Sequence, residues 1–418
     1  MKISKSILFF ITLFFTNLNA QDIPPEVLER MPAEMQEKIM AEKEEKSKDY
    51  ETVQEFLDDG EYETIDGFMT LHKNLEDDEY FLQLDKNDLE KEFIYFAYVL
   101  NAPQAAGVRG GAIGQGAVLE FRRFKDEIAL FKKNTNFSNE TDNNIGKADL
   151  TNIMEAFLDS FEVVVEEGES IVISVSDLFL SETLTSVSPN LPREYRDFVD
   201  LDLGRLDDDK TFINQVRNYP KNTAVEVTFG FSNPKPNQRN AVYAVADARF
   251  TSIVARHLFV EMPDDQFNTR VADQRVGYFS QRVTDLSTYD NYPQRDLINK
   301  WRLIKKDPEA ELSEPVNPIV FWVEKSTPEE IKPMVVKGIE AWNLAFERAG
   351  FKNAIVAKIQ PDDADWDAGD IQYNVVRWSS SPRPAFSGYG PSIGNPRNRK
   401  STRLNSSHSS VSRMPSSA

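Results

Sequence analysis

Apolar and polar residues alternate over most of the first 300 residues, and this period of two is typical of strands that bury one face in a sheet. Short apolar runs lie on either side of acidic or glycine-containing turns, which predicts β-hairpins. The predicted strands are 67–72, 80–84, 93–100, 118–124, 128–132, 163–165, 171–175, 225–229 and 241–260. The sequence therefore predicts an antiparallel, β-rich domain over residues 65–300.

The pattern changes after residue 300. A proline-punctuated stretch at 301–318 is predicted to be a linker. It is followed by apolar strands at 319–323, 355–359 and 371–378, with one amphipathic helix between the first two. The predicted fold class is thus α+β, with a β-rich antiparallel N-terminal domain followed by a strand-helix-strand-strand unit of α/β type.

The predicted helix has clear end signals. Residues 327–330 read Thr-Pro-Glu-Glu, which supplies an N-cap, a proline at the first helical position and a capping-box glutamate. Gly350 ends the helix. Trp342 and Phe346 belong to a single apolar stripe and are expected in the core. Pro333 would remove a hydrogen bond from a helix interior, so a kink or a late start is also expected.

The first 20 residues have the features of a secretory signal peptide. Two lysines precede the apolar run 7–15, and the small residue Ala20 marks the expected cleavage site. The alternative is a membrane anchor, but spanning needs about 20 apolar residues, and no later stretch is long enough either. We therefore expect an exported protein (periplasmic, associated with the outer membrane, or secreted) without a transmembrane segment.

Two further segments stand apart from the predicted domains. Residues 21–64 form a charged helical lead-in with few large apolar residues to anchor it. Residues 398–418 are rich in serine, carry no acidic residue and show no apolar period. This tail is expected to be an artefact of translated foreign DNA, and a genuine serine-rich tail is the alternative.

Composition narrows the possible chemistry. The 418-residue chain has a net charge of −20, which excludes a basic nucleic-acid-binding face for the bulk of the protein. It has no cysteine, so disulfides, thiolate zinc ligands and cysteine nucleophiles are excluded. Only three histidines are present, His72, His257 and His408.

Several segments resemble an exported bacterial zinc-dependent metalloprotease of the metzincin type with uncharacterised N-terminal domains. The segments that carry the resemblance are ADQRVGYFS, INKWRLIKKDPEAELSEPVNPIVF, the helix region VEKSTPEEIKPMVVKGIEAWNLAFERAGF, DIQYNVVRWSSSP and GYGPSIGNPR. The resemblance covers most of residues 60–397, and residues 319–397 correspond to the first part of the protease domain, its upper subdomain.

The resemblance implies a zinc site in the full-length protein and a peptide or protein substrate. The strand after Tyr389 and Gly390 would bind an extended peptide by strand addition. A later helix would carry His-Glu-x-x-His, whose two imidazoles lie on one helix face and bind zinc while the glutamate acts as base. This motif is absent from the sequence. We therefore expect a C-terminally truncated enzyme in which this fragment holds no catalytic or metal-ligating residue, binds no zinc and is inactive alone.

Two charged clusters are candidate sites. Arg270, Asp273 and Arg275 lie just before the predicted protease domain. Asp273 could occupy the zinc in a latent form, and the alternative is an Arg/Asp pair that fixes the domain junction. A second cluster is a calcium-loop candidate, but its spacing lacks the required glycine and glutamate, so a solvated connection between strands is favoured. Its members are Asp362, Asp363, Asp365, Asp367 and Asp370. His257, within a strand pattern, is expected to be a packed or hydrogen-bonded histidine.

Three function hypotheses follow. The first is an N-terminal fragment of a secreted zinc metalloprotease. The second is a non-catalytic, exported β-rich module that binds peptide, glycan or cell-surface partners. The third is a pro-region that assists folding of the protease or keeps it latent. No nucleic-acid partner is expected.

Overall fold

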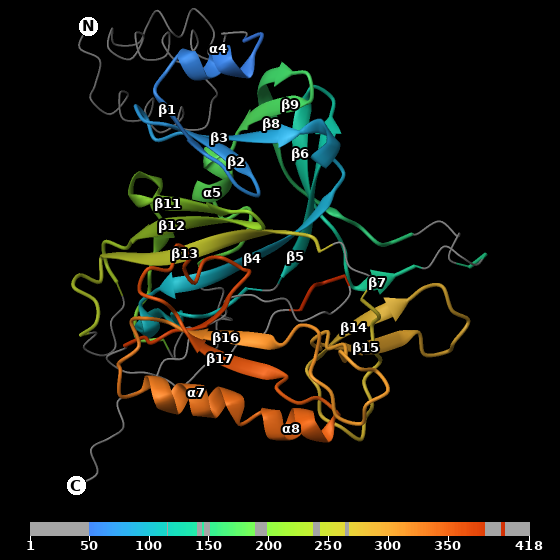
Figure 1. Ribbon diagram of the computed structural model, residues 1–418. Helices are drawn as coiled ribbons and strands as arrows, with labels where there is room; N and C mark the ends of the chain where they lie inside the picture. The colour runs from blue at the N-terminus through green and yellow to red at the C-terminus, as the bar shows by residue number, and fades with distance from the viewer. Residues whose placement is uncertain are drawn as a thin grey trace, which may run out of the picture.

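The computed structural model describes residues 50–114, 116–139, 144–145, 151–188, 199–236, 243–263, 267–380 and 394–397. Strands dominate these residues and helices are few and short (Figure 1). Most strands belong to one large antiparallel sheet in the order β1-β2-β3-β9-β8-β6-β5-β4-β13-β12-β10, and β11 also pairs with β12. The prediction of a β-rich antiparallel N-terminal domain is thus confirmed.

The strands of the large sheet have the following bounds: β1 (Tyr62–Ile65), β2 (Thr70–Asn74), β3 (Tyr80–Asp85), β4 (Glu92–Asn101), β5 (Ala117–Phe124), β6 (Glu127–Lys132), β8 (Ala156–Glu167), β9 (Ser170–Ser174), β10 (Arg205–Leu206), β11 (Phe212–Tyr219), β12 (Asn222–Ser232) and β13 (Phe250–Glu261). The three predicted hairpins are confirmed as the antiparallel pairs β2–β3, β5–β6 and β8–β9. The run predicted from 241 becomes a strand only at Phe250.

The large sheet bends at β5, β6 and β8, so that its first strands lie above β4, β13 and β12 (Figure 1). The inward side chains of both layers form one continuous core, to which helix α5 (Ser176–Leu180) adds Leu178 and Phe179. Because the inward side chains of β4, β12 and β13 are buried in this core, the sheet cannot flatten without exposing them to water.

The two ends of the bent sheet are joined at the turn between β11 and β12. Asn218 donates from Nδ2 to the carbonyl oxygens of Ile65 (2.8 Å) and Met69, and its Oδ1 accepts from the Thr223 hydroxyl (2.6 Å). The contact is close, because a Cβ at Gly67 would lie 2.3 Å from Asn218 Cγ. One side-chain amide therefore binds the β1–β2 connection to the β11–β12 turn.

Helix α4 (Val53–Asp58) packs against the outside of the first strands. Its Phe56 is fully buried in a cluster with Phe81, Val165 and Val172. The Thr52 hydroxyl caps the helix by accepting from the backbone N–H of Glu55 (3.1 Å). One buried aromatic ring thus anchors the end of the lead-in, and β1 begins at Tyr62, just before the predicted boundary at residue 65.

A second, smaller sheet has three strands in the order β15-β14-β7. Its strands are β7 (Phe137–Ser138), β14 (Ser280–Asp285) and β15 (Gln294–Ile298). Short 3-10 helices lie in the described connections of the large sheet: η2 (Lys86–Asp88), η3 (Gln104–Ala106) and η4 (Asp208–Lys210).

Residues 319–377 form a separate layer below the large sheet, which we call the α/β module (Figure 1). Its parallel strands lie in the order β17-β16-β18. Strands β16 (Ile319–Val323) and β17 (Ile355–Ile359) have the predicted bounds, and β18 (Asn374–Val376) is shorter than predicted. Helices α7 (Lys332–Glu340) and α8 (Asn343–Arg348) connect β16 to β17, as parallel neighbours require.

The late start expected from Pro333 is confirmed, whereas the predicted cap and the buried apolar stripe were wrong. The helix begins after Ile331, so that Pro333 falls in the first turn, where its missing N–H costs no hydrogen bond. The expected cap Thr327 therefore lies outside the helix, and its buried hydroxyl has no partner among the described residues. The helix is interrupted at Trp342, whose side chain is 65% exposed rather than in the core.

Among the described residues, no helix is long and apolar enough to cross a membrane.

Replacement of Asn218 tests the closure of the sheet. We expect Asn218→Ala to lower the free energy of unfolding by about 2–3 kcal/mol, because two carbonyl oxygens and one hydroxyl lose their partner. Urea unfolding followed by far-UV circular dichroism measures this loss. The matched control is Asn87→Ala, at an exposed asparagine in η2. Equal stability of the two variants would contradict a closing role for Asn218.

Candidate functional site

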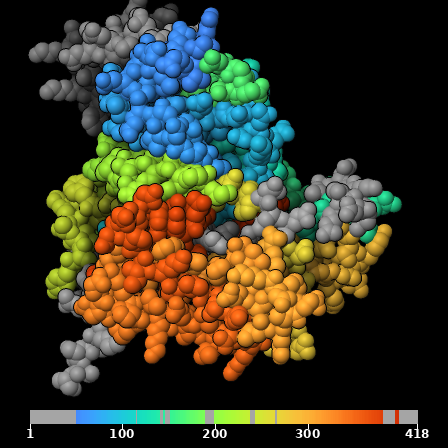
Figure 2. All heavy atoms as spheres, in the orientation of Figure 1, coloured from blue at the N-terminus to red at the C-terminus, as the bar shows by residue number. Residues whose placement is uncertain are grey.

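A group of buried polar contacts lies where the α/β module meets the outer face of the large sheet. This face, formed by outward side chains of β4, β12 and β13, carries a second apolar cluster, whose buried members from the sheet are Ile94, Phe96, Tyr98, Ala224, Leu258 and Val260. The module contributes Ile371 to the same cluster. Figure 2 shows residues 361–380, in red, against the green surface of the β11–β12 region.

The centre of the junction is Asn222, the first residue of β12, which has no exposed surface. Its Nδ2 donates to the carbonyl oxygen of Gly369 (3.0 Å), and its Oδ1 accepts from the backbone N–H of Ile371 (2.9 Å). The side-chain amide thus donates one hydrogen bond and accepts another, as the backbone of a neighbouring strand would. Two segments separated by almost 150 positions in sequence are held in register by this one side chain.

A charged contact flanks Asn222. The Asp367 carboxylate accepts from the Tyr219 hydroxyl (2.8 Å) and pairs with Arg217. Burial acts to raise the pKa of Asp367, but the N–H of Gly369, the Tyr219 hydroxyl and Arg217 outweigh it and lower the pKa overall. Burial, aided by the adjacent carboxylate, raises the pKa of Tyr219. The aspartate is therefore ionised and the tyrosine protonated at neutral pH.

A second polar network lies on the same outer face. Arg256 donates to the Tyr98 hydroxyl (2.8 Å) and to Glu226 (2.9 Å), and Gln215 donates to the same carboxylate (3.0 Å). Burial acts to raise the pKa of Glu226, but the hydrogen bonds from Arg256 and Gln215 lower it overall. Both charges are largely buried and paired, so this network holds β4, β12 and β13 together rather than offering a free catalytic group.

The inner face of these strands carries one buried titratable pair. His257 Nδ1 lies 2.8 Å from the Tyr95 hydroxyl, and its Nε2 has no hydrogen-bond partner among the described residues. Burial alone lowers the pKa of His257 to about 4. The prediction of a packed, hydrogen-bonded histidine is confirmed. His72 is also buried, between Thr64 and Gln83.

The predicted latency cluster forms a local surface turn. Asp273 accepts from the backbone N–H and the guanidinium of Arg275, and this pairing lowers the pKa of the carboxyl to about 2. The Arg270 carbonyl accepts from Ile298 N (2.9 Å), which adds this segment to the edge of β15. A role of Asp273 in latency stays a prediction. Tyr389, Gly390 and His408 lie outside the described residues.

The acidic cluster before β18 is only partly a solvated connection. Asp362, Asp363 and Asp365 are at or near the surface, whereas Asp367 binds the large sheet and Asp370 is buried. Burial raises the pKa of Asp370. The prediction of a purely solvated segment was therefore wrong for its last two aspartates, because the chain turns back onto the large sheet at this point.

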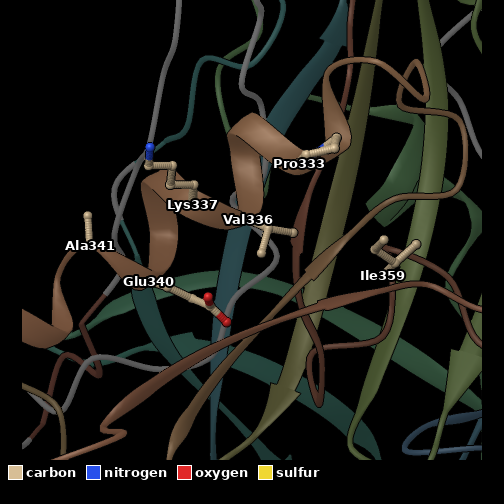
Figure 3. A pocket seen from close by; sticks show the side chains of 6 residues that line it. All are labelled: Pro333, Val336, Lys337, Glu340, Ala341 and Ile359. Atoms are coloured by element: carbon tan, nitrogen blue, oxygen red, sulfur yellow. The ribbon is translucent and has the colours of Figure 1, made fainter.

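An open hollow of about 560 Å³ lies between α7 and β17. Its lining is mostly apolar: Pro333, Val336, Lys337, Glu340, Ala341 and Ile359. Figure 3 shows Val336 and Glu340 extending from α7 toward the side on which Ile359 lies. No histidine, serine or tyrosine is among the described residues that line the hollow.

Over the described ranges, no group of three or more His, Asp or Glu side chains is placed to hold a metal ion.

A family model described as a domain of unknown function (DUF5117) matches residues 110–306. The match runs from just before β5 to the segment between β15 and β16, so it covers much of the large sheet and all of β14 and β15. No curated protein and no solved structure matches the chain.

Sequence reasoning named Asp367 and Asp370 in the acidic cluster but missed their neighbours Tyr219 and Asn222 on the large sheet. Arg256 and Glu226 carried a usable signal, because a charged residue inside an otherwise apolar strand must find a partner when the strand is buried on both faces. Asn222 carried a weaker one: it follows Pro220-Lys221, the two residues of a tight turn between β11 and β12. Neither signal identifies the partner segment at 367–371.

The buried histidine makes the stability of the protein depend on pH. The pKa of His257 is about 4 in the fold, against an ordinary value of 6.5 for an exposed histidine such as that of the unfolded chain. Between these values only the unfolded chain binds the proton, so the free energy of unfolding decreases as the pH falls from 6.5 toward 4, by up to about 3 kcal/mol. Urea unfolding over this pH range measures the slope.

His257→Gln is the matched variant, because glutamine retains a donor and an acceptor but does not titrate. We expect its stability to vary less steeply with pH than that of the parent. Identical slopes for the two proteins would show that His257 does not contribute.

Proposed function

We propose that this chain is the N-terminal part of an exported, zinc-dependent metalloprotease of the metzincin type. In the full-length protein, a zinc-bound water would hydrolyse peptide bonds. One observation supports the proposal most strongly. The segment that carries the resemblance folds as strand, helix, strand and strand, with parallel order β17-β16-β18 and helices α7 and α8 between the first two strands. This is the sheet with a backing helix that the resemblance implies for the upper subdomain.

The described residues do not fit a zinc site. His72 and His257 lie buried on different strands, and each is engaged by neighbouring side chains. Zinc in a catalytic site needs three protein ligands and an open position for water. The proposal therefore places zinc binding and hydrolysis in residues other than those described. The β-rich domain and the α/β module would hold the protease domain and would not perform the chemistry.

A binding module is the second candidate, favoured by exposed aromatic side chains on the β14–β15 hairpin. Tyr289 is 90% exposed at the tip, close in sequence to exposed Tyr292. Arg295 orders this tip by donating to the Tyr292 carbonyl oxygen (2.6 Å) and pairing with Asp290. Preorganised exposed tyrosines are common at protein-binding surfaces. Binding of an exported protein ligand that is independent of zinc and lost in Tyr289→Ser/Tyr292→Ser would favour this candidate.

The protease proposal is tested with two products of the same gene. The 418-residue chain is expected to take up no stoichiometric zinc and to cleave no peptide in a quenched-fluorescence library. The product that continues past codon 397 is expected to bind one zinc per chain and to lose its cleavage with a chelator. The control is a glutamine in place of the motif's glutamate, which should keep the zinc and lose the activity.

Either of two results would contradict the proposal. One is a gene that continues past codon 397 without His-Glu-x-x-His in the next ~150 residues, about one domain. The other is zinc-dependent cleavage by the 418-residue chain alone.

A further inference from the structure

The α/β module has a small core of its own. Its buried aliphatic side chains in and beside the strands are Ile319, Val323, Ala354, Ile355 and Val375. Helices α7 and α8 bury no apolar side chain, and Met334, Trp342 and Leu344 on them are exposed. Segments of this size rarely hold a fold on so few buried groups without further support.

The support comes from the large sheet. Among the described residues of the module, Ile371 is the buried member of the outer apolar cluster, to which Phe96 and Leu258 of the large sheet also belong. Ala368 and Asp370, next to it in the same turn, are buried as well. The turn 367–371, which leads into β18, is thus buried against β4, β12 and β13 rather than against the module's own helices.

The fit between this turn and the β11–β12 turn is close. A Cβ at Gly369 would lie 2.7 Å from the Tyr219 hydroxyl oxygen, so glycine is needed for the approach. The Asn222 side chain forms hydrogen bonds with the Gly369 carbonyl oxygen and the Ile371 N–H. These are two backbone groups that the junction buries and that need hydrogen-bond partners. The contact is therefore specific for the segment 367–371, because an apolar surface alone would not require a glycine or these backbone hydrogen bonds.

A second tie binds the chain beyond β18 to the same region. Arg397 donates from Nε to Glu92 (2.8 Å) at the start of β4, and Asn395 Nδ2 lies 3.4 Å from Met262 Sδ just after β13. Residues before β18 and residues far beyond it in the sequence are thus both tied to the large sheet.

We propose that the outer face of β4, β12 and β13 is an intramolecular docking surface for the turn 367–371, and that the α/β module keeps its structure only while docked there. The β-rich domain acts as the template on which the module folds. This inference goes beyond the proposed function and does not depend on it, since it concerns folding of residues that are all described.

Hydrogen exchange measured by mass spectrometry on the full chain tests the proposal. In Asn222→Ala we expect protection of amides in β16 and β17 to fall at least about tenfold, while protection in β5 and β6 stays at the parent level. The matched control is Asn87→Ala, at an exposed asparagine away from the junction, which should leave both sets unchanged.

A second variant keeps the test decisive if Asn222→Ala does not fold. Ile371→Ala changes only the module side of the contact and leaves every residue of the large sheet in place. It should produce the same selective loss of protection in β16 and β17. Parent-level protection of these strands in Ile371→Ala would overturn the proposal, as would an equal loss in β5 and β6, which would make the two parts one cooperative unit. A protease assay plays no part in this result, so its outcome is separate from that of the proposed function.

Discussion

The two-residue turn between β11 and β12 joins three parts of this molecule. On one side of the turn, Asn218 binds the connection between β1 and β2 and so closes the bent sheet. On the opposite face of the sheet, Asn222 and Tyr219 bind the turn that leads into β18. Asparagine suits both places, because its amide donates and accepts at once and can replace a missing backbone neighbour. Closure of the sheet and docking of the module therefore both depend on the short segment 218–222.

Burial of both faces of β4, β12 and β13 is the second constraint. The inward residues belong to the core between the two layers, and the outward residues belong to the cluster under the module. Strands covered on both sides lose the alternation of apolar and polar residues, as in Phe93–Leu100. Polar residues in such strands are tolerated only with partners, and Arg256 with Glu226 and His257 with Tyr95 show how these are supplied.

The module and the β-rich domain contribute differently to the proposed protease. The module supplies the sheet and helices that the resemblance associates with the catalytic domain, and the β-rich domain supplies the surface against which that sheet is held. The match to a domain of unknown function falls on the second of these parts. A role as structural support gives this domain a physical task whether or not it also binds a ligand or maintains latency.

Local chemistry made several elements predictable. The hairpins β5–β6 and β8–β9 follow from apolar runs on either side of a short polar turn, and β16 and β17 follow from five-residue apolar runs with clear ends. The late start of α7 follows from Pro333. These features depend on interactions between residues close in the chain, which a pattern can record.

The closure of the sheet and the junction were decided by the tertiary structure. Asn222 and Gly369 are 147 residues apart, and Asn218 and Ile65 are 153 apart. No local pattern encodes which distant backbone group a side-chain amide will meet, since that depends on how the whole sheet bends. The same holds for Trp342, which the helical period placed in the core. It is exposed because the module lies against the large sheet with its other side. The sequence alone thus determined the strongly apolar strands and their hairpin turns, and the three-dimensional fold decided which of them meet.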